Sequence, residues 1–201
     1  GNGASDKSDG YILTTSCLFH CPFQSFVISR LNQGFFDHVS IIFRRKVHRV
    51  LFCLRGCCKT VPEIKDHGND ELNTLAAQAC VSAVYEADVA DRVEYISFSI
   101  TACKALHEAD TEAKVAYLSG DKTPDELSGM GLTGLDYTLD RYTSNPTWIK
   151  EARDLEMTTN VWTIDGTDDI VKSNNLGIDF ITTNNPVEAL KIQKIYQEMN
   201  R

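Results

Sequence analysis

The sequence predicts an α/β fold, an incomplete (β/α)8 TIM-type barrel with about six strand–helix units in residues 62–201. Short β-branched runs alternate strictly with helical patterns after Pro62, which indicates a parallel sheet. No Gly-x-Gly-x-x-Gly follows an expected strand, so an open dinucleotide-binding sheet lacks its signature. Six compact units over this length of chain are what three quarters of such a barrel would occupy.

Six short runs rich in β-branched and aromatic residues are the expected strands. They are Glu63–Lys65, Tyr95–Phe98, Val115–Leu118, Gly134–Tyr137, Asn160–Ile164 and Phe180–Thr183. Helical patterns fill the intervals between them. The first helix has an apolar face at helical spacing, formed by Leu72, Leu75, Ala76, Ala79, Ala83 and Val84.

The later helices are expected from their start and stop signals. Thr123-Pro124-Asp125-Glu126 combines a cap, a proline in the first turn and a reciprocal capping Glu. Asn145-Pro146 begins the next helix, with four residues facing inward: Trp148, Ile149, Ala152 and Leu155. Thr167 opens another helix that Gly177 ends, and Asn185-Pro186 starts the last one.

Charge and hydropathy narrow the class of protein. The net charge of −8 argues against a general nucleic-acid binder, and no apolar run approaches the length of a transmembrane helix. We therefore expect a soluble globular protein with no nucleic-acid partner and no membrane span. The chain begins at Gly1, so the sequence leaves a cytoplasmic, periplasmic or secreted location open.

The composition changes near residue 61. Residues 1–61 carry a net charge of +5, five of the seven cysteines and seven of the nine phenylalanines, whereas residues 62–201 carry −13. We therefore divide the chain into an atypical basic, Cys/Phe-rich segment (1–61) and the barrel portion (62–201). The paired two-residue cysteine spacings of zinc sites are absent. Cys80 and Cys103 fall on apolar helix positions and are expected to be buried free thiols.

Active sites of (β/α)8 barrels lie at the C-terminal ends of the strands. Six residues stand there as candidates: Glu63, Lys65, Phe98, Asp136, Trp162 and Thr183. Glu63 and Lys65 are two apart in one strand and point to the same face. An ion pair at the strand end is an alternative for these two. Barrel packing is the alternative for Trp162 and Phe98, and capping of a neighbouring loop is the alternative for Asp136 and Thr183.

Several strand motifs carry a family resemblance. They are Glu63-Ile64-Lys65, Ile96-Ser97-Phe98, Tyr117-Leu118, Gly131-Leu132-Thr133-Gly134-Leu135-Asp136, the run 160–165 (NVWTID) and the run 177–186 (GIDFITTNNP). In their order across residues 63–190, they resemble the glycerophosphodiester phosphodiesterase family. The resemblance implies a phosphodiesterase-type TIM barrel that hydrolyses glycerophosphodiesters to glycerol 3-phosphate and an alcohol, with a place in lipid metabolism.

The resemblance also implies a cofactor and roles for site residues. The family binds one divalent cation, calcium or magnesium, and Glu63 matches a metal-binding Glu. A hard cation prefers such oxygen ligands. Lys65 matches a lysine near the phosphate, and Trp162 matches a tryptophan that lines the substrate pocket; Phe98 is a further substrate-binding candidate. A glycerophosphodiester or glycerol phosphate would be the small-molecule partner.

The segment 1–61 departs from the family pattern. A full member begins with a His-Arg-Gly strand, a Pro-Glu-Asn-Thr loop, a Glu-x-Asp strand and a His-Asp hairpin, and residues 1–61 contain none of these motifs. No catalytic residue is assigned, because His67 and His107 match neither catalytic histidine and are expected to be solvent-exposed. We expect weak or no activity. The alternative is a non-catalytic binding module for phosphorylated small molecules on the same barrel.

Two interpretations of residues 1–61 are open. The segment is either a divergent N-terminal region or an out-of-frame stretch, and its lack of glutamate favours the second. Ile41–Phe43 and Val50–Leu54 are its candidate strands. We expect an ordered core in 62–201 and loose packing over much of the first segment.

Overall fold

A computed structural model of the chain describes residues 11–14, 27–28 and 61–199. In this part the strands form one parallel, eight-stranded sheet. The strands are β1 (Tyr11–Thr14), β2 (Val27–Ile28), β3 (Glu63–Ile64), β4 (Glu94–Ser97), β5 (Lys114–Tyr117), β6 (Gly134–Tyr137), β7 (Thr158–Val161) and β8 (Phe180–Thr183). The six strands expected in the acidic part are confirmed, although the ends of several of them shift.

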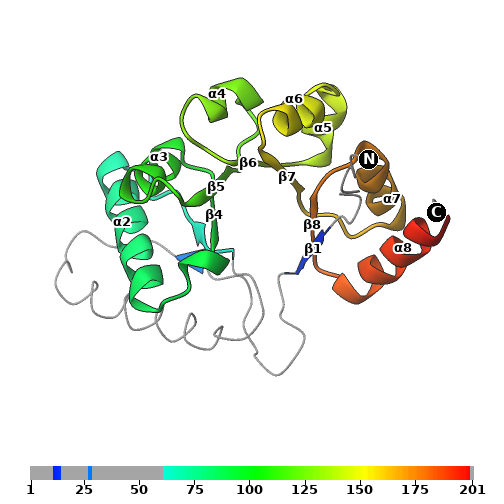
Figure 1. Ribbon diagram of the computed structural model, residues 1–201, viewed down its shortest axis with the longest axis horizontal. Coiled ribbons are helices and arrows are strands. Elements are labelled where there is room, and N and C mark those ends of the chain that lie inside the picture. Colours follow the sequence, from blue (N-terminus) through cyan, green and yellow to red (C-terminus); the bar gives the residue numbers. More distant parts are fainter. Residues whose placement is uncertain (1–10, 15–26, 29–60, 200–201) are drawn as a thin grey trace, which may run out of the picture.

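The strand order is that of a (β/α)8 barrel opened at one junction. Neighbours run β1-β8-β7-β6-β5-β4-β3-β2, so each strand from β3 to β8 lies beside the next one in the chain. In a closed barrel β1 would also pair with β2. Among the residues described here no such pair is present, and the sheet curls into an arc (Figure 1). The incomplete barrel predicted from the sequence is therefore confirmed.

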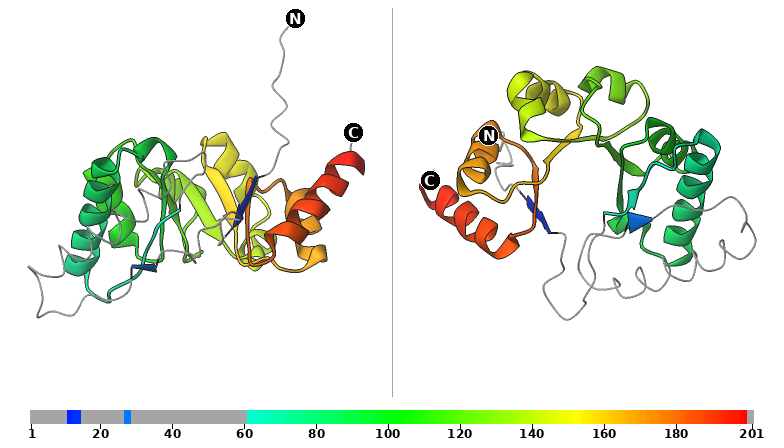
Figure 2. Two further views of the ribbon diagram at one scale, coloured as in Figure 1. Left: turned by 90° about the horizontal axis from the view of Figure 1, so that it is seen from below. Right: turned by 180° about the vertical axis from the view of Figure 1, so that it is seen from behind.

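The helices lie along the outer side of this arc, as Figures 1 and 2 show from three directions. They are α2 (Asp70–Glu86), the 3-10 turn η1 (Ala90–Arg92), α3 (Ile100–Ala109), α4 (Pro124–Ser128), α5 (Leu139–Ser144), α6 (Trp148–Asp154), α7 (Thr167–Leu176) and α8 (Pro186–Met199). The inner side of the arc is left to side chains from the strands.

Local signals placed several helix ends correctly. Thr123 and Glu126 form the reciprocal capping box at the start of α4. Gly177 ends α7 in the left-handed conformation, with φ of 74°. The short helix α5 was not expected. Helix α6 begins at Trp148, two residues after Pro146, because the Trp148 amide first closes a turn onto the Asn145 carbonyl.

The hydrophobic core lies between the outer face of the sheet and the helices. Tyr95, Val115 and Leu135 cover the sheet side, and Ala76 and Leu106 belong to the helices that pack on it. Cys80 and Cys103 are buried free thiols, as predicted. Two expected core residues are instead exposed, Leu75 at 39% and Leu155 at 37%. No helix in the described ranges has the length and apolar character needed to cross a bilayer.

Strands β1 and β2 come from the basic segment and were not expected where they occur. The candidate strands Ile41–Phe43 and Val50–Leu54 lie outside the described residues, as does the expectation about packing of the first segment. The division of the chain at residue 61 stays a prediction.

Candidate functional site

The C-terminal ends of the strands bring the candidate residues to one rim of the arc. Glu63 and Lys65 stand at the end of β3, and Lys65 Nζ donates a hydrogen bond of 2.6 Å to Glu63 Oε1. Ile64, which lies between them, is fully buried on the opposite face. The two side chains therefore share the inner face, as their spacing predicts. The ion-pair interpretation is also correct in geometry, since the ammonium and the carboxylate lie in direct contact.

A buried polar network holds the segment that follows β3. Asn73 of α2 accepts a 2.8 Å hydrogen bond from the backbone amide of His67. Its amide nitrogen donates to Asp66 Oδ1 at 3.0 Å and to Ser99 Oγ at 2.9 Å. Ser97 Oγ completes the network by donating to the Ile64 carbonyl at 2.6 Å. Sequence reasoning missed Asn73, although an asparagine next to Leu72 on the apolar face of a helix is a signal of this kind.

Phe98 and Trp162 form an aromatic pair at the same rim. Their ring centroids are 5.5 Å apart at an interplanar angle of 85°, an edge-on arrangement that aromatic quadrupoles favour. Phe98 follows β4 and is 37% exposed, while Trp162 follows β7 and is half-buried. The two rings link strands that are not neighbours in the sheet. Neither ring is therefore a fully enclosed core residue.

The Trp162 side chain is fixed on its polar edge as well. Its indole Nε1 donates a 2.8 Å hydrogen bond to the Asp136 carbonyl on β6. Its backbone amide donates to the Tyr137 carbonyl at 3.2 Å. The backbone bond continues the β6–β7 pairing one residue past Val161, where β7 ends three residues before the Ile164 expected from the sequence.

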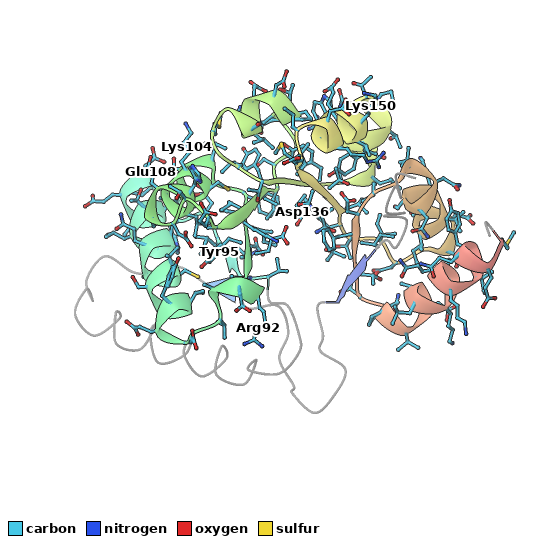
Figure 3. The ribbon with its side chains drawn as sticks, in the orientation of Figure 1. Arg92, Tyr95, Lys104, Glu108, Asp136 and Lys150 are labelled. Atoms are coloured by element: carbon cyan, nitrogen blue, oxygen red, sulfur yellow. The ribbon has the colours of Figure 1, made fainter. Side chains whose placement is uncertain are left out.

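Asp136 is a buried acid in the middle of the sheet. It is 1% exposed, and Figure 3 shows it on the inner side of the arc, whereas Lys104, Glu108 and Lys150 point outward from the helices. Burial raises the pKa of this carboxyl to about 7, and the negative charges of Glu94 and Glu63 add to the effect. Its Oδ1 has no hydrogen-bond partner among the described residues. The suggested loop-capping role is therefore wrong for Asp136.

Thr183 does take the capping role. Its hydroxyl donates to Asp165 Oδ1 at 3.0 Å and accepts from the Asn185 amide at 3.0 Å, just before α8. The sequence placed Thr183 among the candidates because it ends a strand. The structure makes it part of the connection between β7 and β8.

The two histidines of the described region behave differently from expectation. His67 is only half-exposed, and its two ring nitrogens are buried without a hydrogen-bond partner. Burial lowers its pKa. His107 is half-buried and its ring lies against Gly131. The expectation that both are solvent-exposed is wrong, because the ring nitrogens of His67 are buried and the turn at Gly131 lies against the His107 ring.

The oxygen ligands for a divalent cation are sparse in this part of the chain. Calcium takes six to eight oxygen ligands and magnesium six. The described ranges contain no group of three or more His, Cys, Asp or Glu side chains arranged to hold a metal. Glu63 supplies one carboxylate at the rim. The described residues on their own therefore do not fit a complete cation site.

A parallel sheet in barrel order, helices outside and charged and aromatic residues at the C-terminal strand ends define a (β/α)8-barrel type of protein. The family model of the glycerophosphoryl diester phosphodiesterase family matches residues 57–188. The chain belongs to this family. No curated protein sequence matches the chain.

Solved structures agree with this assignment. The chain resembles the crystal structure of a glycerophosphodiester phosphodiesterase from Parabacteroides distasonis ATCC 8503, with a TM-score of 0.71 and 35% identity over 79% of this chain and 65% of that one. A glycerophosphodiester phosphodiesterase from Agrobacterium tumefaciens str. C58 gives 0.56 at 18% identity, over 69% of this chain and 58% of that one. An Oleispira antarctica phosphodiesterase, solved with the product sn-glycerol-3-phosphate, gives 0.54 at 16% identity, over 71% and 56%.

These structures differ in what they support. At 18% and 16% identity, the last two support the fold alone. The chain spans less than two thirds of the length of each of the three neighbours.

Proposed function

We propose that the chain derives from a metal-dependent phosphoric diester hydrolase that cleaves glycerophosphodiesters, and that it has little or no turnover itself. The observation that carries the proposal is the Glu63–Lys65 pair at the rim of the sheet, formed by the C-terminal strand ends and called the mouth below. Lys65 Nζ lies 2.6 Å from Glu63 Oε1, at the end of the strand that matches the family motif. Lys65 would meet the phosphate and Glu63 would supply one ligand to a calcium or magnesium ion.

The aromatic residues support a pocket for the rest of the substrate. The half-buried Trp162 and the exposed Phe98 present ring surface at the same rim as the Glu63–Lys65 pair. Such surface suits the carbon skeleton of glycerol or of the alcohol group, while the charged pair suits the phosphate. A glycerophosphodiester or glycerol phosphate is therefore the proposed ligand.

The expectation of weak turnover rests on the sequence. Residues 1–61 carry neither the His-Arg-Gly motif nor the His-Asp hairpin that would supply a general acid and base. We propose the boundary between the atypical segment and the barrel portion near residue 61. The family match from residue 57 supports this position.

A direct assay tests the proposal. The full chain is incubated with glycerophosphocholine and calcium or magnesium, and release of glycerol 3-phosphate is measured against Glu63→Gln. We expect release at or near the background of the variant. Robust turnover would contradict the claim of weak activity, and a low turnover lost in Glu63→Gln would identify a weakened hydrolase rather than a module that only binds.

Binding is measured separately by calorimetry with glycerol 3-phosphate, with and without calcium. We expect binding that is stronger in the presence of the cation. Absence of binding under both conditions would contradict the proposed ligand.

A further inference from the structure

Asp165 ties together two loops at the rim that carries Trp162. Asp165 lies between β7 and α7, and its carboxylate accepts three hydrogen bonds from the end of β8 and the residue after it. Oδ1 accepts from the Thr183 hydroxyl at 3.0 Å and from the Asn184 backbone amide at 2.8 Å. Oδ2 accepts from the Asn184 side-chain amide at 2.9 Å. All three hydrogen bonds therefore come from the adjacent residues Thr183 and Asn184.

The same loop is fixed on its other side. Ile164 donates its backbone amide to the Thr182 carbonyl at 2.9 Å, whereas Trp162 bonds to β6 through its amide and its indole nitrogen. The loop from Trp162 to Asp165 therefore bridges β6 and β8. Between these two sets of bonds, the Trp162 ring lies edge-on to Phe98.

We propose that Asp165 is a positioning residue that sets the orientation of Trp162 at the mouth and thereby shapes the ligand pocket. The effect on the ligand rests on the proposed function, whereas the effect on the ring does not. Asp165 is exposed and is one residue beyond Ile164, so it does not itself belong to the packed core. Its three charge-assisted bonds fasten this loop to the β8–α8 connection, beside the backbone bond from Ile164 to Thr182.

Three variants separate this role from a general loss of charge. Asp165→Ala removes all three bonds. Asp165→Asn keeps the acceptor that faces Thr183 and the Asn184 amide, and rotation of the Asn184 side chain presents its oxygen to the new amide. Asp168→Ala, in the exposed first turn of α7, removes the same charge nearby and serves as the matched control.

Trp162 itself reports the result. In a Trp148→Phe background Trp162 is the sole tryptophan, since the chain contains two. We expect acrylamide quenching of its fluorescence to rise about twofold in Asp165→Ala, because a released loop opens locally and exposes the ring. We expect it to stay near the parent value in Asp165→Asn and in Asp168→Ala. Quenching in Asp165→Ala equal to that in Asp168→Ala would overturn the proposal.

A milder variant guards against loss of folding. Asn184→Ala removes the bond to Oδ2 alone from an exposed position, and we expect a smaller rise in quenching in the same direction. If quenching rises in neither Asn184→Ala nor Asp165→Ala, the proposal that the Asp165 hydrogen bonds hold this loop is contradicted.

Calorimetry with glycerol 3-phosphate gives the functional readout. We expect affinity to fall about tenfold in Asp165→Ala and to recover in Asp165→Asn, because small displacements of positioning groups are costly. If the parent protein binds no glycerol 3-phosphate, the proposed function fails, and the quenching result still decides the positioning role.

Discussion

Lys65 Nζ lies 2.6 Å from Glu63 Oε1, and both groups project from the end of β3 toward the inner side of the sheet. The Glu63 side chain is 14% exposed and that of Lys65 is 36% exposed. A pair so close to solvent contributes little to folding, because water and mobile ions screen it. Because the pair stands at the rim of the sheet, we expect it to matter more for the proposed anionic ligand than for stability.

Replacing Lys65 separates these two contributions. We expect Lys65→Met to change the free energy of unfolding by about 1 kcal/mol, near the upper end of the range for exposed ion pairs, because the pair is partly buried. Affinity for glycerol 3-phosphate should fall more than about tenfold, because a charge-assisted hydrogen bond to the phosphate is lost. Urea unfolding and calorimetry measure the two effects. Lys65→Arg keeps the charge and is the control; equal losses of affinity in both variants would argue against a phosphate at this position.

Asp136 makes stability depend on pH. Its pKa is raised by burial to about 7 from an ordinary 3.8, so between these values the folded protein keeps a proton that the unfolded chain has released. The free energy of unfolding should therefore fall as pH rises from about 4 to about 7, by at most on the order of 4 kcal/mol, and then level off.

Asp136→Asn removes this titration without changing the size of the side chain. We expect the variant to gain stability relative to the parent as pH rises through the same window, measured by urea unfolding at several pH values. Asp168→Asn, at an exposed position, is the control and should follow the parent. Parallel pH profiles for Asp136→Asn and the parent would contradict the burial of this acid.

Among the polar residues that hold the segment after β3, we expect replacement of Asn73 to lower the free energy of unfolding most. Asn73→Ala breaks three hydrogen bonds at a buried position and should lower the free energy of unfolding by about 3 kcal/mol, at about 1 kcal/mol for each bond. Thr74→Ala, at a neighbouring surface position, should cost less than about 0.5 kcal/mol beyond the helix-propensity change. Chemical denaturation of both variants gives the comparison, and similar costs would show that the Asn73 network contributes little.

Comparing Gly131 with Gly68 separates the cost of a steric contact from the cost of backbone strain. Both have positive φ, 76° and 68°, so alanine is strained at either position. A Cβ on Gly131 would lie 2.2 Å from His107 Nε2, whereas one on Gly68 would have no atom within 4 Å. We expect Gly68→Ala to cost about 1 kcal/mol and Gly131→Ala at least about 1 kcal/mol more.

The extra cost at Gly131 should depend on the histidine. In a His107→Ala background the space beside Gly131 is free, so Gly131→Ala should then cost no more than Gly68→Ala in the parent. Thermal or urea unfolding of the four variants measures this. An unchanged cost of Gly131→Ala without His107 would show that backbone strain alone decides it.

Each expectation that the structure contradicts has a physical reason. Leu75 and Leu155 fit an apolar helical spacing yet are exposed, because spacing identifies a face but not how far the neighbouring element extends over it. His107 looked free on the edge of its helix, but the turn at Gly131 covers it. Helix α5 was missed because six residues are too few to show a helical period.

The sequence by itself determined the order of strands and helices, the cap at Thr123 and the stop at Gly177. These features depend on residues that are close along the chain, so local chemistry is sufficient to specify them. It also placed Glu63 and Lys65 on one face, because the alternation of a strand needs no partner.

The tertiary structure alone decided which distant groups meet. The packing of elements far apart in the chain brings Phe98 beside Trp162, Asn73 beside Ser99 and Asp165 beside Asn184. It also encloses Asp136, whose pKa depends on burial and on the charges of Glu94 and Glu63. Such contacts join residues far apart in the chain, and their energies depend on distance and solvent exclusion, which a linear pattern does not encode.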